Sequence, residues 1–170
     1  MKRVFLLAAV AALALTACTV YVTPSDVSVT GRLRFGIGVS DVIQVFEPSR
    51  GPGSSYRVGE TIAFRVLTNQ DGYLTLSAID PDGAVYTFAR NLRVRGGRVQ
   101  VFEGPDAGSV FSLVPPRGLH RVRAVFTSAP TSGLVSYRGV VGETVWTARI
   151  RSEVSDHQVR DIAETSFYLD

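Results

Sequence analysis

Apolar and polar residues alternate with a period of two along most of the chain. In residues 32–39, Leu33, Phe35, Ile37 and Val39 alternate with arginines and glycines. This predicts a β-strand with one buried face, because successive side chains of a strand point to opposite faces of the sheet. Alternation or a short apolar run predicts further strands at residues 42–46, 62–66, 73–79, 84–89, 98–102, 109–114, 119–127 and 165–169.

Turn-forming residues separate these strands. The sequence Asn69-Gln-Asp-Gly72 lies between two apolar runs and predicts a hairpin in which Gly72 has a positive φ. Asp80-Pro-Asp-Gly83 fits a type I turn, with proline at the second place and glycine at the fourth. The turn-rich residues 49–55 predict a loop.

One segment departs from the period of two. In residues 143–154, Trp146, Ile150 and Val154 are spaced four apart, with charged residues off that stripe. This spacing predicts a short amphipathic helix that packs on the sheet through Trp146. A strand at residues 144–150 is the competing interpretation, and stacking of Trp146 on a sugar or a partner is the competing role.

Short strands at regular spacing, with no helix between them, predict an all-β fold. We expect an immunoglobulin-like β-sandwich of about 7–9 strands with one short helix near the C-terminus. A body of this size can form one core without disulfides. We therefore expect a single domain over residues 27–170.

The N-terminus has the three parts of a secretory signal peptide. Lys2 and Arg3 form a short basic region, residues 4–16 are uncharged, and small residues follow. The apolar stretch is shorter than the about 20 residues that a membrane-spanning helix needs. We therefore expect residues 1–17 to be removed on export.

Leu15-Thr-Ala-Cys18 resembles the lipobox of bacterial lipoproteins, in which the cysteine receives a diacylglycerol and becomes the first mature residue. The resemblance implies lipidation of Cys18, a lipidated tether at residues 18–26 and attachment to the membrane. Two or more acyl chains hold a protein stably at a bilayer. An aspartate as the second mature residue holds such lipoproteins in the inner membrane. Here the second mature residue is Thr19, which favours the outer membrane. An ordinary signal peptide with a chance cysteine is the alternative.

Charge excludes one class of partner. Once Lys2 and Arg3 have left with the signal, 16 arginines remain against 15 acidic residues. The mature chain is close to neutral, whereas binding of nucleic acid needs a concentrated basic surface. We expect no nucleic-acid partner.

Four motifs in the middle of the chain resemble an uncharacterised bacterial domain family. They are Tyr56-Arg-Val-Gly-Glu60, Asn69-Gln-Asp-Gly-Tyr-Leu74, Asp80-Pro-Asp-Gly83 and Pro116-Arg-Gly118. Members of that family, a domain of unknown function, occur in exported proteins and lipoproteins. The resemblance covers about residues 56–128 and implies a shared fold, since its motifs are turn and core positions. It implies no catalytic residue.

Candidate catalytic and metal-binding residues are few. His120 and His157 are the only histidines, and a zinc or copper site usually needs three or four nitrogen or sulfur ligands. We expect both on the surface or on an edge strand, and we expect no metal or other cofactor. The hydrolase motif Gly-x-Ser-x-Gly is absent. Gly36 and Gly38 lack the third glycine of a dinucleotide-binding loop, and we expect a strand kink or bulge there.

The densest basic cluster is the candidate interaction site. It consists of Arg90, Arg93, Arg95 and Arg98. These side chains could bind phosphate-bearing glycans, lipid headgroups or an acidic partner. Solvated charges on strand faces and in a turn are the alternative interpretation.

Two hypotheses for function follow. The first is a lipid-anchored binding or scaffolding module of the cell envelope, with a protein or polysaccharide as its partner and no enzyme activity. The second is an envelope enzyme, hydrolase-like, whose site is assembled from residues distant in sequence. A pocket that brings His120 or His157 together with an acid and a serine would favour the second.

Overall fold

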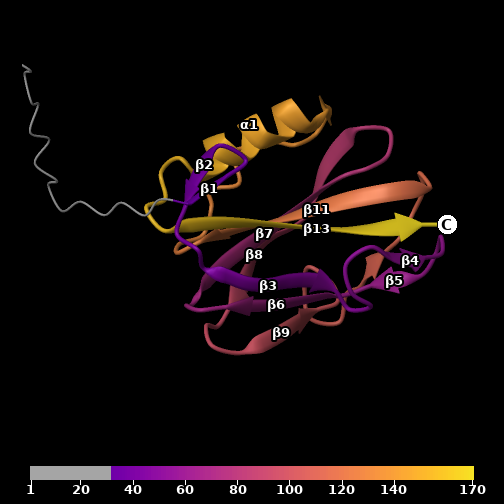
Figure 1. Cartoon of the computed structure of the whole chain (residues 1–170), viewed down its shortest axis with the longest axis horizontal. Coiled ribbons are helices and arrows are strands. Elements are labelled where there is room, and N and C mark those ends of the chain that lie inside the picture. Colours follow the sequence, from indigo (N-terminus) through magenta and orange to yellow (C-terminus); the bar gives the residue numbers. More distant parts are fainter. Residues whose placement is uncertain (1–31) are drawn as a thin grey trace, which may run out of the picture. The chain divides into compact units, whose positions relative to one another are not determined.

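The computed structural model of the chain describes residues 32–170, in which thirteen strands and one helix form three stacked layers (Figure 1). The signal peptide predicted at residues 1–17, Cys18 and the tether predicted at residues 18–26 lie outside the described residues. The predicted all-β sandwich with one short helix near the C-terminus is confirmed. No helix within residues 32–170 has the length and apolar character that crossing a membrane requires.

The middle layer is a six-stranded sheet in the order β12-β8-β7-β11-β13-β4. Its pairs are antiparallel except β13–β4, which is parallel. Its central strands are buried along most of their length, because other layers cover both faces of the sheet. The strands are β4 (Ser54–Tyr56), β7 (Gly72–Ile79), β8 (Ala84–Val94), β11 (Gly118–Thr127), β12 (Val140–Val141) and β13 (Arg160–Leu169).

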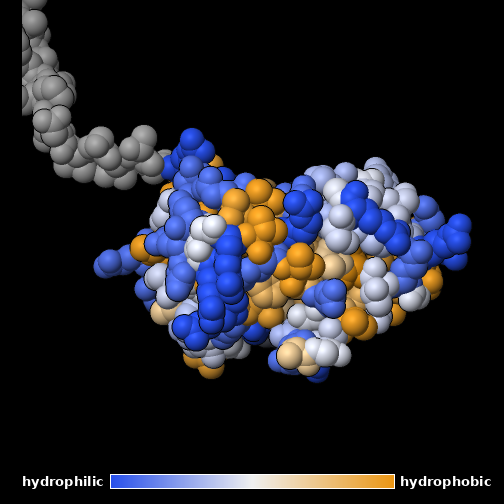
Figure 2. Space-filling view, turned by 90° about the horizontal axis from the view of Figure 1, so that it is seen from below, coloured by the Kyte–Doolittle hydropathy of each residue, from blue (hydrophilic) through white to orange (hydrophobic). Residues whose placement is uncertain are grey.

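A three-stranded sheet packs on one face of the middle layer. It consists of β3 (Ile43–Pro48), β6 (Phe64–Thr68) and β9 (Val99–Phe102), in the order β3-β6-β9. Between the two sheets lies the larger core cluster, which includes Phe64, Leu76 and Phe126. The outer face of the small sheet carries apolar residues among polar ones (Figure 2). A two-stranded patch, β5 (Thr61–Ile62) with β10 (Phe111–Ser112), stands beside this sheet.

The helix α1 (Glu143–Val154) covers the other face of the middle layer (Figure 1), with the residue range that the sequence predicts. Its stripe of Trp146, Ile150 and Val154 is buried in a second core cluster with residues of β2, β7, β11 and β13. The Trp146 side chain is fully buried and its Nε1–H donates a hydrogen bond to Ser77 Oγ at 2.9 Å. The core role of Trp146 is confirmed.

The single strand predicted for residues 32–39 is wrong. The segment is a hairpin of β1 (Arg32–Arg34) and β2 (Ile37–Val39), in which Arg34 pairs with Ile37. Phe35 and Gly36 form the two-residue turn with φ of 54° and 71°, the combination that a type I′ turn requires. Gly36 therefore serves a turn and not a strand kink.

The hairpin predicted at residues 69–72 is also wrong. β6 pairs with β3 and β9, whereas β7 pairs with β8 and β11, so residues 69–71 connect one sheet to the other. Gly72 lies in β7 and is not among the described glycines with positive φ. A Cβ at this position would overlap the ring of Phe126 and lie 2.7 Å from the carbonyl oxygen of Thr127. Close packing, and not turn geometry, requires a glycine here.

The turn at residues 80–83 is confirmed. The Gly83 N–H donates to the Asp80 carbonyl at 3.0 Å, and Asp80 Oδ1 accepts hydrogen bonds from the N–H groups of Asp82 and Ala84. The turn joins β7 to β8, and the register continues from Ile79 opposite Val85. It fixes Asp80 at one end of the site described next.

Candidate functional site

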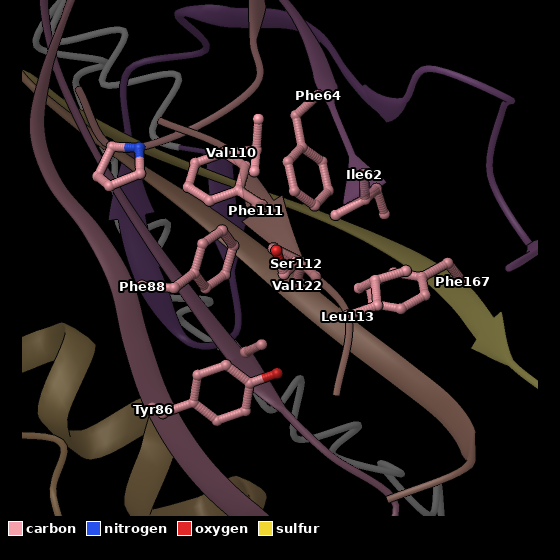
Figure 3. Close-up of a pocket in the computed structure, with 12 residues that line it drawn as sticks. Ile62, Phe64, Tyr86, Phe88, Val110, Phe111, Ser112, Leu113, Val122 and Phe167 are labelled. Carbon is pink, nitrogen blue, oxygen red and sulfur yellow. The ribbon is translucent and has the colours of Figure 1, made fainter. Parts of the chain in front are cut away.

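An apolar pocket of about 270 Å³ opens between the two sheets, beside the β5–β10 patch (Figure 3). Its lining comes from strands that are distant in sequence, so the pocket is formed by the fold as a whole and not by a single sequence motif. The residues include Ile62 of β5, Phe64 of β6, Phe88 of β8, Phe111 of β10, Val122 of β11 and Phe167 of β13. Val110 and Tyr86, both substantially exposed, also line the pocket.

Aromatic rings support one another around this pocket. The rings of Phe88 and Phe111 meet edge to face with centroids 5.1 Å apart, and Phe64 lies 6.0 Å from Phe111 and 5.9 Å from Phe88. Such edge-to-face pairs stabilise one another beyond simple burial. In Figure 3 Tyr86 lies below Phe88, and the centroids of these two rings are 6.2 Å apart. The apolar part of the site is therefore formed without a ligand.

A second pocket of about 290 Å³ continues from the first. The two share Tyr86, Ser112 and Leu113. The second is also lined by Asp80, Val114, Pro115, Pro116 and His120. We call the two pockets together the aromatic groove and the second one its polar end.

His120 is the most unusual residue of the polar end. It is 2% exposed, its ring stacks on Phe167 at a centroid distance of 5.0 Å, and its Nε2 lies 2.8 Å from the carbonyl oxygen of Pro116. A carbonyl can only accept, so Nε2 carries a proton, and in the neutral imidazole Nδ1 then keeps a lone pair. Nδ1 is buried and has no hydrogen-bond partner among the described residues. The predicted surface position of His120 is wrong, because β11 is an inner strand of a sheet covered on both faces.

Tyr86 and Asp80 complete the polar end. Partial burial of the phenol, and then the negative charge of Asp80, raise the pKa of Tyr86 above its ordinary value of 10.0. The Tyr86 hydroxyl is therefore protonated at neutral pH and can donate a hydrogen bond. Asp80 contributes a carboxylate whose Oδ1 already accepts two backbone N–H groups. None of the residues that line the groove is a lysine or an arginine.

The polar end brings together a serine, a histidine and an acid, namely Ser112, His120 and Asp80. A catalytic triad needs a hydrogen bond from nucleophile to base and another from base to acid. His120 instead donates to Pro116, and Asp80 accepts from backbone N–H groups. The three residue types converge without the relay that would activate the serine. Within residues 32–170, no group of three or more His, Cys, Asp or Glu residues is placed to hold a metal ion.

The arginine cluster is divided in the structure. Arg90 is partly buried and pairs with Glu153, which also accepts a hydrogen bond from Tyr137. Arg93, Arg95 and Arg98 are exposed and form no ion pair with any residue in the 32–170 range. Arg93 lies near the end of β8, and Arg95 and Arg98 lie in the connection from β8 to β9, which belongs to the other sheet.

Two buried charges escaped the sequence analysis. Arg123 of β11 is fully buried and donates to Glu164 at 2.7 Å, Thr147 at 2.8 Å and Glu143 at 2.9 Å. Asp161 is fully buried and accepts hydrogen bonds from the N–H groups of Val42, Ile43 and Ile162. Both tie separate layers or strands together, and neither lines the groove.

Comparison with known families agrees with the resemblance seen in the sequence. Residues 55–130 match the model of a domain of unknown function (DUF4384). The expected similarity to an uncharacterised domain family is confirmed. No curated protein and no solved structure matches the chain.

The DUF4384 match and the aromatic groove coincide. Every residue that lines the groove, apart from Phe167 of β13, falls within residues 55–130. The helix α1 lies outside this segment, whereas Arg121 and Arg123 of β11, which pair with Glu143 of the helix, lie within it. The groove is therefore built mainly from the part of the chain that is similar to DUF4384.

Proposed function

We propose that the chain is a lipid-anchored protein of the bacterial cell envelope that acts as a binding or scaffolding module. Its partner is an envelope protein or a polysaccharide, and the aromatic groove is the surface that receives it. The single observation that carries the binding role is a preformed concave apolar site with a few polar groups at one end, which is the usual form of a ligand site.

The sequence of the N-terminus supports the anchor. The lipobox-like Leu15-Thr-Ala-Cys18 follows an apolar stretch of signal-peptide length. Lipidation of Cys18 accounts for the one cysteine of an exported chain, which otherwise would be a free thiol or form an intermolecular disulfide. Thr19, and not aspartate, is the second residue of the mature protein, and this favours the outer membrane.

Photo-crosslinking in intact cells tests the binding role. A benzophenone amino acid at Val110, on the rim of the groove, should capture one reproducible envelope species. The same group at Val141, which is exposed on β12 and outside the groove, serves as the matched control. Equal capture at both positions, or none at Val110, would argue against the groove as the binding surface.

The alternative is an envelope hydrolase with a site assembled from distant residues. It is favoured by one observation, the convergence of Ser112, His120 and Asp80 on the polar end. Rearrangement of His120 away from Pro116 would be needed to form a Ser112–His120 hydrogen bond. A fluorophosphonate probe should then label the wild-type protein and fail to label Ser112→Ala, and absence of wild-type labelling would remove this alternative.

A further inference from the structure

We propose that the aromatic groove binds a neutral amphiphile, an apolar group about the size of an aromatic ring or a short acyl chain that carries a hydroxyl next to it. This assignment rests on the proposed role of the groove as the binding site. It adds the chemical class of the ligand, and it excludes carboxylates and phosphates.

The apolar requirement follows from the first pocket. Its walls are side chains of phenylalanine, valine, leucine and isoleucine, and their polar neighbours are confined to the other end. A volume of about 270 Å³ accommodates a ring or a short chain and not a helix. Burial of apolar ligand surface against these rings supplies the favourable free energy.

The hydroxyl requirement follows from His120. In the neutral ring, Nδ1 is a buried acceptor without a hydrogen-bond partner among the described residues, and leaving such a group unpaired is unfavourable. Nδ1 is closed to solvent in this structure, so a ligand O–H can donate to it once the side chains around the polar end move apart, and the hydrogen bond then offsets this cost. The same oxygen can accept a hydrogen bond from the Tyr86 hydroxyl, which lines the same pocket.

Charge selects against anionic ligands. Asp80 is the only carboxylate among the residues that line the groove, and no lysine or arginine lines it to offset an anion. A carboxylate or phosphate would lose its hydration without a compensating cation. A neutral hydroxyl group needs no compensating cation.

Three probes of matched size test the assignment. They are 3-phenylpropan-1-ol, propylbenzene and 3-phenylpropanoate, titrated into the mature chain, residues 18–170, with Cys18→Ser so that no detergent competes. Binding is followed through the backbone amide signals of Ser112 and Leu113. The alcohol should bind roughly 2- to 12-fold more tightly than propylbenzene, the ratio that one hydrogen bond of about 0.5–1.5 kcal/mol supplies. The carboxylate should bind more weakly than the alcohol.

Two variants locate the effect. His120→Phe keeps a ring against Phe167 and removes the acceptor, so the alcohol and propylbenzene should bind equally well. Ser112→Trp, at an exposed position shared by both pockets, should block all three probes. Thr61→Trp is the matched control, because Thr61 is exposed, pairs with Ser112 across β5–β10 and lines neither part of the groove.

The outcomes separate this inference from the proposed function. Three results with the wild-type protein would each overturn the hydroxyl assignment: equal affinities for the alcohol and propylbenzene, tighter binding of the carboxylate, or no binding of any probe. These comparisons use only the wild-type protein, so they do not depend on whether His120→Phe folds. If the probes fail while crosslinking at Val110 still captures a partner, the binding role stands and only the ligand class is wrong.

Discussion

The guanidinium carbon of Arg123 lies 4.0 Å from the centre of the Trp146 ring, so a buried charge of β11 packs directly against the main apolar residue of α1. The same carbon lies 3.8 Å from the centre of the Phe35 ring in the β1–β2 turn. Glu143 and Glu164 neutralise the guanidinium, and Thr147 accepts a third hydrogen bond. Arg123 thereby joins the helix and the hairpin to the middle sheet.

Replacement of Arg123 by lysine should be destabilising although it keeps the charge. An ammonium group cannot donate in three fixed directions or stack on two rings as a planar guanidinium does. We expect Arg123→Lys to lower the free energy of unfolding by about 2 kcal/mol. Urea denaturation measures the change, with Arg121→Lys, a partly exposed neighbour, as the control that should change by less than about 1 kcal/mol. Equal effects in the two variants would contradict the bridging role of Arg123.

The contribution of Glu143 should depend on pH. Its hydrogen bond with Arg121, together with the charges of Arg121 and Arg123, lowers the pKa of Glu143 below its ordinary value of 4.5. A carboxylate with a lowered pKa in the folded state stabilises the fold above its unfolded pKa and loses that effect as pH falls through the folded pKa. Glu143→Gln should therefore be less stable than wild type by about 0.5–1 kcal/mol at pH 7, and the difference should shrink below pH of about 4.5.

Thermal unfolding at several pH values tests this dependence. Glu103→Gln is a suitable control, since Glu103 is exposed and forms no ion pair with residues 32–170. A Glu143→Gln difference that stays constant from pH 7 to pH 3 would show that the carboxylate charge is not the source of the effect.

Gly72 tests the corrected interpretation of the connection between the sheets. A methyl group at this position would overlap the Phe126 ring in the core and crowd the Thr127 carbonyl. We expect Gly72→Ala to cost about 1–3 kcal/mol, as overpacking of a close-packed core does, with Gly72→Val costing more. Gly38→Ala is the control, because Gly38 lies in a strand without positive φ and its nearest neighbour would be 4.0 Å away. No loss of stability in Gly72→Ala would contradict the close packing.

The sequence predicts those parts of the fold in which the spacing of the apolar residues fits one kind of buried surface. The four-residue spacing of Trp146, Ile150 and Val154 fits a helix on an apolar face better than the competing strand, and it gave the correct element. Arg121 and Arg123 alternate with apolar residues in the manner of a solvated face. Arg123 is nevertheless fully buried beneath α1, because the sheet is covered on both sides, whereas Arg121 stays partly exposed.

The local pattern of apolar and polar residues also failed to predict the turn at Phe35 and Gly36 and the aromatic groove. Phe35 occupies a positive φ that bulky residues rarely adopt, so alternation across residues 32–39 concealed a hairpin. The groove is assembled from strands spread between Ile62 and Phe167, and His120 becomes a buried acceptor only when β11 takes an inner place in the sheet. Long-range pairing determines these features, and no short motif records it.

Charge reversal tests the exposed arginines. If Arg93 and Arg95 contact the envelope partner, Arg93→Glu with Arg95→Glu should leave the melting temperature close to that of wild type and reduce crosslinked yield from the Val110 position. The double variant Arg138→Glu with Arg149→Glu makes the same change in net charge at exposed sites elsewhere, and it controls for charge alone. Unchanged yield in the first variant would leave Arg93 and Arg95 as solvated surface charges.

Cys18 carries the prediction that decides the cellular location. Diacylation requires its thiol, and cleavage before Cys18 depends on that modification, so Cys18→Ser should block both steps. The variant should accumulate with its signal or be cut elsewhere. Because the variant lacks the acyl chains, any form freed of its signal should enter the soluble envelope fraction, whereas wild type should enter the detergent phase. Metabolic labelling with a fatty-acid analogue measures lipidation directly. Label in wild type and none in Cys18→Ser is the expected result, and a wild-type protein without label would remove the lipoprotein assignment while leaving export through the signal peptide intact.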